Sequence, residues 1–111
     1  MGIDKNLVQG SMALLLLRLL ETKDMYGYEM IEALRSKSNN VFELKAGALY
    51  PLLPSLESKG YVMSYEDASS GKKRRYYQLT EAGRHHSSEK KQEWMTYQSA
   101  VTNVLSMEGG C

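Results

Sequence analysis

The sequence has almost no cysteine and no long apolar run, the features that define disulfide-rich proteins and membrane proteins. Its one cysteine, Cys111, is the last residue, so a disulfide framework is excluded and a reduced, intracellular protein is expected. The longest apolar run covers residues 12–20 and is interrupted by Arg18, whereas a membrane-spanning helix needs about 20 apolar residues. No small-residue cleavage site follows this run. We therefore expect a cytoplasmic protein without a membrane partner.

An excess of one charge is also lacking, because 14 Lys and Arg residues face 13 Asp and Glu residues, for a formal net charge of +1. A strongly basic coat for nucleic acid is thereby excluded, and any contact with DNA must depend on where the charges lie. The hydrophobic share of 42% and the charged share of 24% are typical of a globular chain. A length of 111 residues is enough for one compact domain.

Hydrophobic spacing predicts three helices in the first 60 residues. The first, over residues 5–21, is apolar on most of its circumference and should be buried between other elements. The second covers residues 26–37. The third covers residues 46–59 although it contains two prolines, because its leucines follow the helical i, i+3, i+4, i+7 spacing. Gly60 is expected to end it.

A β-hairpin and a fourth helix follow. Residues 61–66 and 75–79 alternate in polarity on either side of a polar loop that ends in glycine, which is typical of a hairpin. Thr80 is expected to cap a final helix that reaches about residue 107. The order predicts a mainly α fold with a small β-hairpin. It is that of a winged helix-turn-helix in which the hairpin is the wing.

Four segments carry a resemblance to a known family: MYGYE at residues 25–29, GALYPLL at 47–53, LESKGYV at 56–62 and RRYYQLTEAG at 74–83. Together they resemble the PadR family of bacterial transcriptional regulators. The resemblance implies a homodimeric repressor that binds an inverted-repeat operator in double-stranded DNA and is often released by a small ligand. It also implies a DNA-binding winged-helix domain over residues 1–83, and a long C-terminal dimerisation helix with a short flexible tail over residues 84–111.

Basic residues at the tip of the wing are the first candidates for contact with DNA. Lys72, Lys73, Arg74 and Arg75 form the only dense cluster of positive charge, and such a cluster can neutralise phosphates. Alternation places Arg75 with Tyr77 toward the core, so Lys72, Lys73 and Arg74 are the expected phosphate contacts. An ordinary solvated loop is the alternative interpretation.

The third helix supplies the second set of candidates, because a helix-turn-helix protein inserts the N-terminal part of this helix into the major groove. Lys45 can reach a guanine or a phosphate, Tyr50 and Ser55 can bind phosphates, and Ala48 can contact a thymine methyl group. Relatives usually carry Ser, Thr or Asn where this chain has Lys45. A merely solvated helix face is again the alternative.

An apolar seam on the last helix predicts a homodimer. Trp94, Tyr97, Val101 and Val104 recur at spacings of three, four and three residues, which is how a helix presents a face to another helix. The predicted interface consists of Trp94, Tyr97, Val101, Val104 and Leu105. Some relatives use a tryptophan at the place of Trp94 to stack planar aromatic ligands, so a planar aromatic effector is a further hypothesis. Simple packing of Trp94 in the interface is its alternative.

These patterns predict a sequence-specific DNA-binding transcriptional regulator. A winged-helix module that binds only protein is the alternative function. An enzyme is not expected, because two adjacent histidines and one terminal cysteine cannot build a catalytic triad. No cofactor and no metal are expected either, since His85 and His86 diverge by about 100° on a helix.

Overall fold

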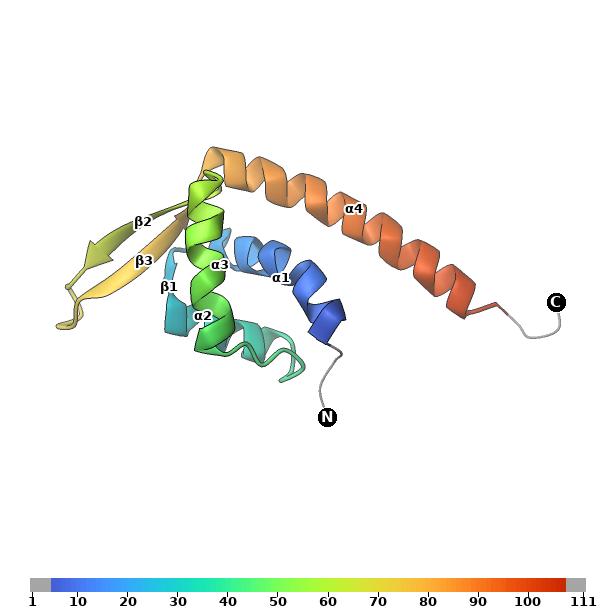
Figure 1. Cartoon of the computed structure of the whole chain (residues 1–111), viewed down its shortest axis with the longest axis horizontal. Helices are drawn as coiled ribbons and strands as arrows, with labels where there is room; N and C mark the ends of the chain where they lie inside the picture. The colour runs from blue at the N-terminus through green and yellow to red at the C-terminus, as the bar shows by residue number, and fades with distance from the viewer. Residues whose placement is uncertain (1–4, 108–111) are drawn as a thin grey trace.

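The computed structural model describes the backbone of residues 5–107 and the side chains of residues 11–107, so that Cys111 lies outside the described part. The four predicted helices and the hairpin are all present (Figure 1). The helices are α1 (Lys5–Leu20), α2 (Gly27–Lys37), α3 (Ala46–Ser58) and α4 (Glu81–Leu105), and the strands are β1 (Met25–Tyr26), β2 (Val62–Asp67) and β3 (Arg74–Leu79).

One strand was not predicted from the sequence. β1 joins the hairpin to make a three-stranded antiparallel sheet in the order β1-β3-β2. It has only two residues, too few to show the alternation by which a strand is recognised. Because β1 leads directly into α2, the pairing of Tyr26 with Tyr76 attaches the helix-turn-helix to the wing.

The hydrophobic core is built around α1, whose Leu16 and Leu17 are completely buried. This confirms the prediction that a helix apolar on most sides lies between other elements. The remaining core comes from one face each of α2 and α3 and from the inner face of the sheet. Its members there include Met30, Leu34, Leu49, Leu53, Leu56, Val62, Tyr77 and Leu79.

Both prolines of α3 lie within the helix, as the leucine spacing predicted. Each removes one N–H donor, which leaves the carbonyls of Gly47 and Tyr50 without their usual helical partner. Gly47, Tyr50, Pro51 and Pro54 are all exposed, so water can satisfy these carbonyls. Gly60, with a φ of 80°, ends the helix as expected.

The start of α4 is held against the end of α3. The Thr80 side chain caps α4 by accepting the N–H of Gly83 at 3.0 Å, and its hydroxyl donates to the carbonyl of Gly60 at 2.6 Å. One turn later the buried Ser87 hydroxyl donates to Glu21 at 2.9 Å, at the end of α1. Beyond this point α4 runs outward from the rest of the fold (Figure 1).

We expect Gly83→Ala to destabilise the fold by about 1–3 kcal/mol, the usual cost of overpacking. An added methyl group would overlap the carbonyl oxygen of Tyr61, which also accepts the Thr80 N–H at 3.1 Å. Gly47→Ala is the control, because nothing lies within 4 Å of its added methyl group and alanine favours a helix by up to about 1 kcal/mol. Urea denaturation measures both. Equal stability of Gly83→Ala and the wild type would contradict the packing described for this junction.

Candidate nucleic-acid interface

The recognition-helix candidates are all exposed, but the helix separates them into two groups. At about 100° per residue, Ala48 and Ser55 lie on one margin of the exposed face and Tyr50 lies on the other. Lys45 is the N-cap residue and forms no side-chain capping bond. Its side chain is exposed, so its ammonium can reach beyond the start of the helix.

The predicted wing residues differ in their surroundings. Lys72 and Lys73 are exposed at the hairpin tip, and the Lys73 ammonium lies 3.5 Å from the Glu66 carboxylate. Arg74 is half-buried, with its guanidinium 4.4 Å from the centre of the Tyr26 ring. This cation–π contact holds Arg74 against the beginning of α2.

Arg75 corrects one expectation. It shares a strand face with the buried Tyr77, as the alternation predicted, but its side chain is exposed. The reason is that β3 extends past the two-residue β1, so its first residues reach beyond the core. Arg75 is therefore accessible to a ligand. Only its membership of the basic cluster could have indicated this from the sequence.

A hollow of about 300 Å³ lies where α2, α3 and β3 meet, and we call it the arginine hollow. It is lined by Tyr26, Gly27, Tyr50, Arg74, Arg75 and Tyr77. The structure thus brings together the predicted residues Tyr50 and Arg74. The sequence interpretation did not assign Tyr26, Gly27 and Tyr77 to a site, because nothing in the local pattern places them beside Tyr50.

Stacked tyrosines on the outer face of the sheet support the wing. Tyr76 stacks on Tyr65 at 5.8 Å and meets the edge of Tyr26 at 5.4 Å. The Tyr65 hydroxyl donates to the Asp24 carboxylate at 2.5 Å, and this hydrogen bond raises the pKa of Tyr65 to about 12. The hydrogen bond joins β2 to the segment that precedes β1, and the raised pKa extends the neutral, donating form of the phenol into alkaline solution.

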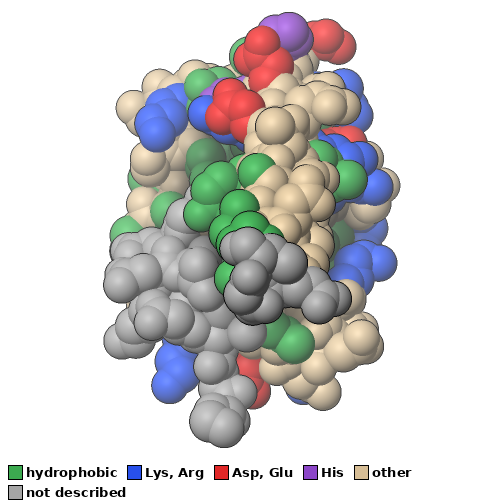
Figure 2. Space-filling model, turned by 90° about the vertical axis from the view of Figure 1, so that its right-hand side faces the viewer, with side chains coloured by type: hydrophobic (Ala, Val, Ile, Leu, Met, Phe, Trp, Pro, Cys, Tyr) green, Lys and Arg blue, Asp and Glu red, His purple; other side chains and the backbone are tan. Residues whose placement is uncertain are grey.

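The predicted seam lies on the continuation of the face by which α4 packs onto its own chain. At about 100° per residue, Trp94 and Val101 lie on the same side of α4 as the buried Gly83 and Ser87, further toward its C-terminal end. With the exception of Val101, exposure along the seam rises toward the end of the helix. Trp94 is 43% exposed, Tyr97 61%, Val104 67% and Leu105 79%, while Val101 is half-buried. Figure 2 views this end of the molecule and shows hydrophobic side chains gathered near the middle of the face.

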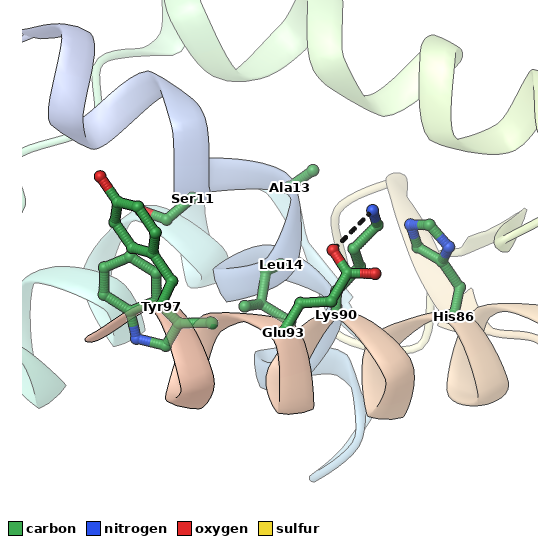
Figure 3. A pocket seen from close by; sticks show the side chains of 8 residues that line it. Ser11, Ala13, Leu14, His86, Lys90, Glu93 and Tyr97 are labelled. Atoms are coloured by element: carbon green, nitrogen blue, oxygen red, sulfur yellow. Dashed lines mark hydrogen bonds and ion pairs between the residues drawn. The ribbon is translucent and has the colours of Figure 1, made fainter. Parts of the chain in front are cut away.

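An open cavity of about 390 Å³ lies between α1 and the middle of α4 (Figure 3). It is lined by Ser11, Ala13, Leu14, His86, Lys90, Glu93, Trp94 and Tyr97. The rings of Trp94 and Tyr97 are 5.9 Å apart at one end. Glu93 accepts a hydrogen bond from Lys90 at 3.2 Å, and Figure 3 shows this pair beside His86. The cavity therefore combines aromatic surface with charged groups of both signs.

The two histidines have separate environments. His85 is exposed and lies 3.5 Å from Glu89, whereas His86 stacks on Tyr61 at 4.1 Å. Within the part of the chain that the structure describes, no three His, Cys, Asp or Glu side chains are grouped as a metal site would require. In that same part no helix has both the length and the hydropathy needed to span a membrane.

Comparison with known proteins agrees with this architecture. The model of the transcriptional regulator PadR-like family matches residues 16–89. A protein of Lysinibacillus sphaericus named "Uncharacterized protein X" is 34% identical over 108 residues, covering 96% of this chain and 97% of its own length. A transcriptional regulator structure from Clostridium thermocellum matches with a TM-score of 0.84 at 29% identity, covering 91% of this chain and 96% of the other. A PadR family transcription regulator from Clostridium difficile matches with a TM-score of 0.75 at 37% identity, covering 86% and 99%.

The helix-turn-helix, the wing and the long final helix define a winged-helix transcription regulator. The chain belongs to the transcriptional regulator PadR-like family, which confirms the resemblance seen in its motifs. It is therefore a DNA-binding regulator. Neither the family nor the similar solved structures are enzymes.

Proposed function

We propose that the protein is a homodimeric repressor that binds an inverted-repeat operator and acts in the cytoplasm. In this proposal residues 1–83 form the DNA-binding domain, and residues 84–111 provide dimerisation. The observation that carries it is the exposure of basic wing residues together with the face of α3 that carries Lys45, Ala48, Tyr50 and Ser55. A module that binds only protein would not need this concentration of positive charge on a chain whose net charge is +1.

We expect salt-sensitive binding to a duplex with two half-sites about one helical turn apart. The double substitution Lys72→Ala and Lys73→Ala should weaken binding to every sequence. It should also reduce the slope of log affinity against log salt by about 0.9 for each phosphate that the variant no longer neutralises. Both effects are measured by mobility-shift titration of DNA that flanks the protein's own gene, repeated at several salt concentrations.

The control is Arg84→Ala with Lys91→Ala, which removes the same charge from exposed positions on α4. An equal effect of both double substitutions would mean that the wing has no special role. Failure of the wild type to bind any duplex at low salt would contradict the proposal itself.

The proposal of a homodimer rests on the exposed seam of α4. Helix α4 meets the end of α1 at Ser87 and Glu21 and beyond this contact runs outward from the rest of the fold (Figure 1). The last turns of α4 carry exposed apolar side chains. A second copy provides an equally apolar seam, and burial contributes roughly 1.5–3 kcal/mol per large side chain.

Val104→Asp with Leu105→Asp should convert the dimer to a monomer, because both carboxylates would be buried in the interface without partners. Ser99→Asp with Asn103→Asp is the matched control, since these residues lie on the opposite side of α4 at about 100° per residue. Sedimentation or light scattering measures the mass. A dimer that survives the first pair of substitutions would place the interface elsewhere.

We also propose that the cavity beside Trp94 binds a planar aromatic effector, preferably a cation. Trp94 and Tyr97 provide surfaces for stacking, and cation–π contact with such rings is worth about 1 kcal/mol. Glu93 adds a carboxylate to the lining, where Lys90 pairs with it at 3.2 Å, so a cationic effector would compete with Lys90 for this group. Because the cavity adjoins the proposed dimer seam, an effector that prefers one spacing of the subunits would shift the dimer away from the form that fits DNA.

Trp94 is the only tryptophan, so its fluorescence reports directly on the cavity. A planar cationic dye should quench this fluorescence saturably. The Trp94→Ala variant should no longer bind the dye, as measured by the fluorescence anisotropy of the dye, but it should still bind DNA. Glu93→Gln should lower the affinity for the cationic dye but leave the affinity for a neutral planar dye unchanged. Tyr28→Ala, which removes an exposed aromatic ring outside the cavity, is the control. Unchanged dye affinity in Trp94→Ala would contradict the effector site.

A further inference from the structure

The arginine hollow is small and strongly cationic. Its volume of about 300 Å³ is at the lower limit for ligand sites, which suits a single small group better than a whole cofactor. Two arginines, Arg74 and Arg75, line it, and the Arg74 guanidinium lies over the ring of Tyr26, another lining residue. Planar guanidinium forks match the oxygens of phosphate and carboxylate groups.

Both arginines lack the acidic partners that their strand positions offer. In the register of β2 and β3, Glu66 faces Arg75 and Asp67 faces Arg74. Glu66 instead pairs with Lys73 at 3.5 Å, and Asp67 accepts the Ser69 N–H at 2.8 Å. Among the described residues neither arginine has an ion-pair partner. The wing therefore holds two uncompensated positive charges at the hollow.

Tyrosine hydroxyls complete the lining. A Cβ added to Gly27 would stand 2.5 Å from the Tyr50 hydroxyl, so the absence of a side chain at Gly27 lets this hydroxyl rest on the first residue of α2. Tyr77 is only 7% exposed, and its hydroxyl has no hydrogen-bond partner among the described residues. This hydroxyl nevertheless keeps some accessible surface, since no buried side-chain oxygen or nitrogen among the described residues lacks a partner, so it is available to donate to a ligand.

The beginning of α2 adds to the attraction for an anion. The first amides of a helix have no intrahelical acceptor and give this end a partial positive charge. The nearby carboxylate of Glu29 is already engaged by the Tyr26 N–H at 3.2 Å and the Lys23 ammonium at 3.3 Å. Its negative charge is therefore offset by Lys23, and Glu29 is not among the residues that line the hollow.

We propose that the arginine hollow binds a phosphate group, with Arg75, Arg74 and the Tyr50 hydroxyl as its ligands. Tyr50 lies on the exposed face of α3, so the hollow opens beside the helix that enters the major groove, where backbone phosphates lie. The bound group is then a DNA phosphate. This assignment of the source rests on the proposed function, whereas the chemistry of the hollow does not.

The first experiment uses inorganic phosphate and the full-length protein without DNA. In amide-resolved NMR at constant ionic strength, phosphate should shift the Gly27 and Tyr28 resonances saturably, and chloride should not. Arg75→Gln should lose the saturable shift. Arg84→Gln, which removes the same charge from α4 outside the hollow, should retain it.

The second experiment tests the source of the phosphate. Arg75→Gln should bind duplex DNA more weakly than the wild type and reduce the salt slope by about 0.9, the value of one phosphate contact. Methylphosphonate substitution removes one charge of the DNA backbone at a time. At one position per half-site it should weaken DNA binding by the wild type but not DNA binding by Arg75→Gln. Arg84→Gln should respond to every substitution as the wild type does.

The two experiments fail separately. If the NMR shift is saturable but Arg75→Gln binds DNA as the wild type does, the hollow binds a free phosphate compound and the assignment to DNA is overturned. If the wild type binds no DNA at all, the proposed function fails while the NMR result stands by itself. The phosphate site is overturned if phosphate causes no saturable NMR shift in the wild type and if Arg75→Gln, shown by its amide spectrum to be folded, binds DNA as the wild type does.

Discussion

The burial of α1 is the constraint on which the rest of the structure depends. Leu16 and Leu17 have no exposed surface, and burying side chains of this size contributes roughly 1.5–3 kcal/mol each. Helices α2 and α4 and the sheet all pack against α1, so one element sets the position of the helix-turn-helix, the wing and the final helix. Ser87 and Glu21 add a polar link at 2.9 Å where α4 leaves it. Helix α3 packs in turn on α2 and β2, so its orientation relative to the seam of α4 follows from elements that α1 positions.

The low net charge of the chain is compatible with DNA binding because the charges are distributed unevenly. Lys23 and Lys90 each pair with a glutamate, at 3.3 Å and 3.2 Å. In the wing, Lys73 takes up Glu66, which leaves Arg74 and Arg75 uncompensated. Arg74 is held by the ring of Tyr26, and that ring is held by Tyr76. Local placement, and not the total charge of +1, therefore produces the cationic surface beside α3.

Most of the fold could be predicted because periodicity in the sequence reflects burial. The leucines of α3 indicated a helix in spite of Pro51 and Pro54, and the structure agrees. Both prolines lie on the exposed side, where water can bind the carbonyls that lose their helical partners. The strand β1 escaped prediction because two residues carry no period. The same short strand explains the error over Arg75: alternation identifies the face of a strand, but whether that face is covered depends on how far the neighbouring elements extend.

The sequence by itself determined the order and type of the long elements, the family, and the candidate residues on the wing, on α3 and on α4, since each depends on local spacing or on a contiguous motif. Only the tertiary structure brought Tyr50 to Gly27 and both to Arg74 and Arg75, because these residues come from three elements separated by loops. Likewise, only packing distinguished the part of α4 that is buried at Gly83 and Ser87 from the part that remains exposed at Val104 and Leu105. The physical reason is that a helical period fixes which side chains share a face, whereas the course of the neighbouring elements in space determines how much of that face is covered.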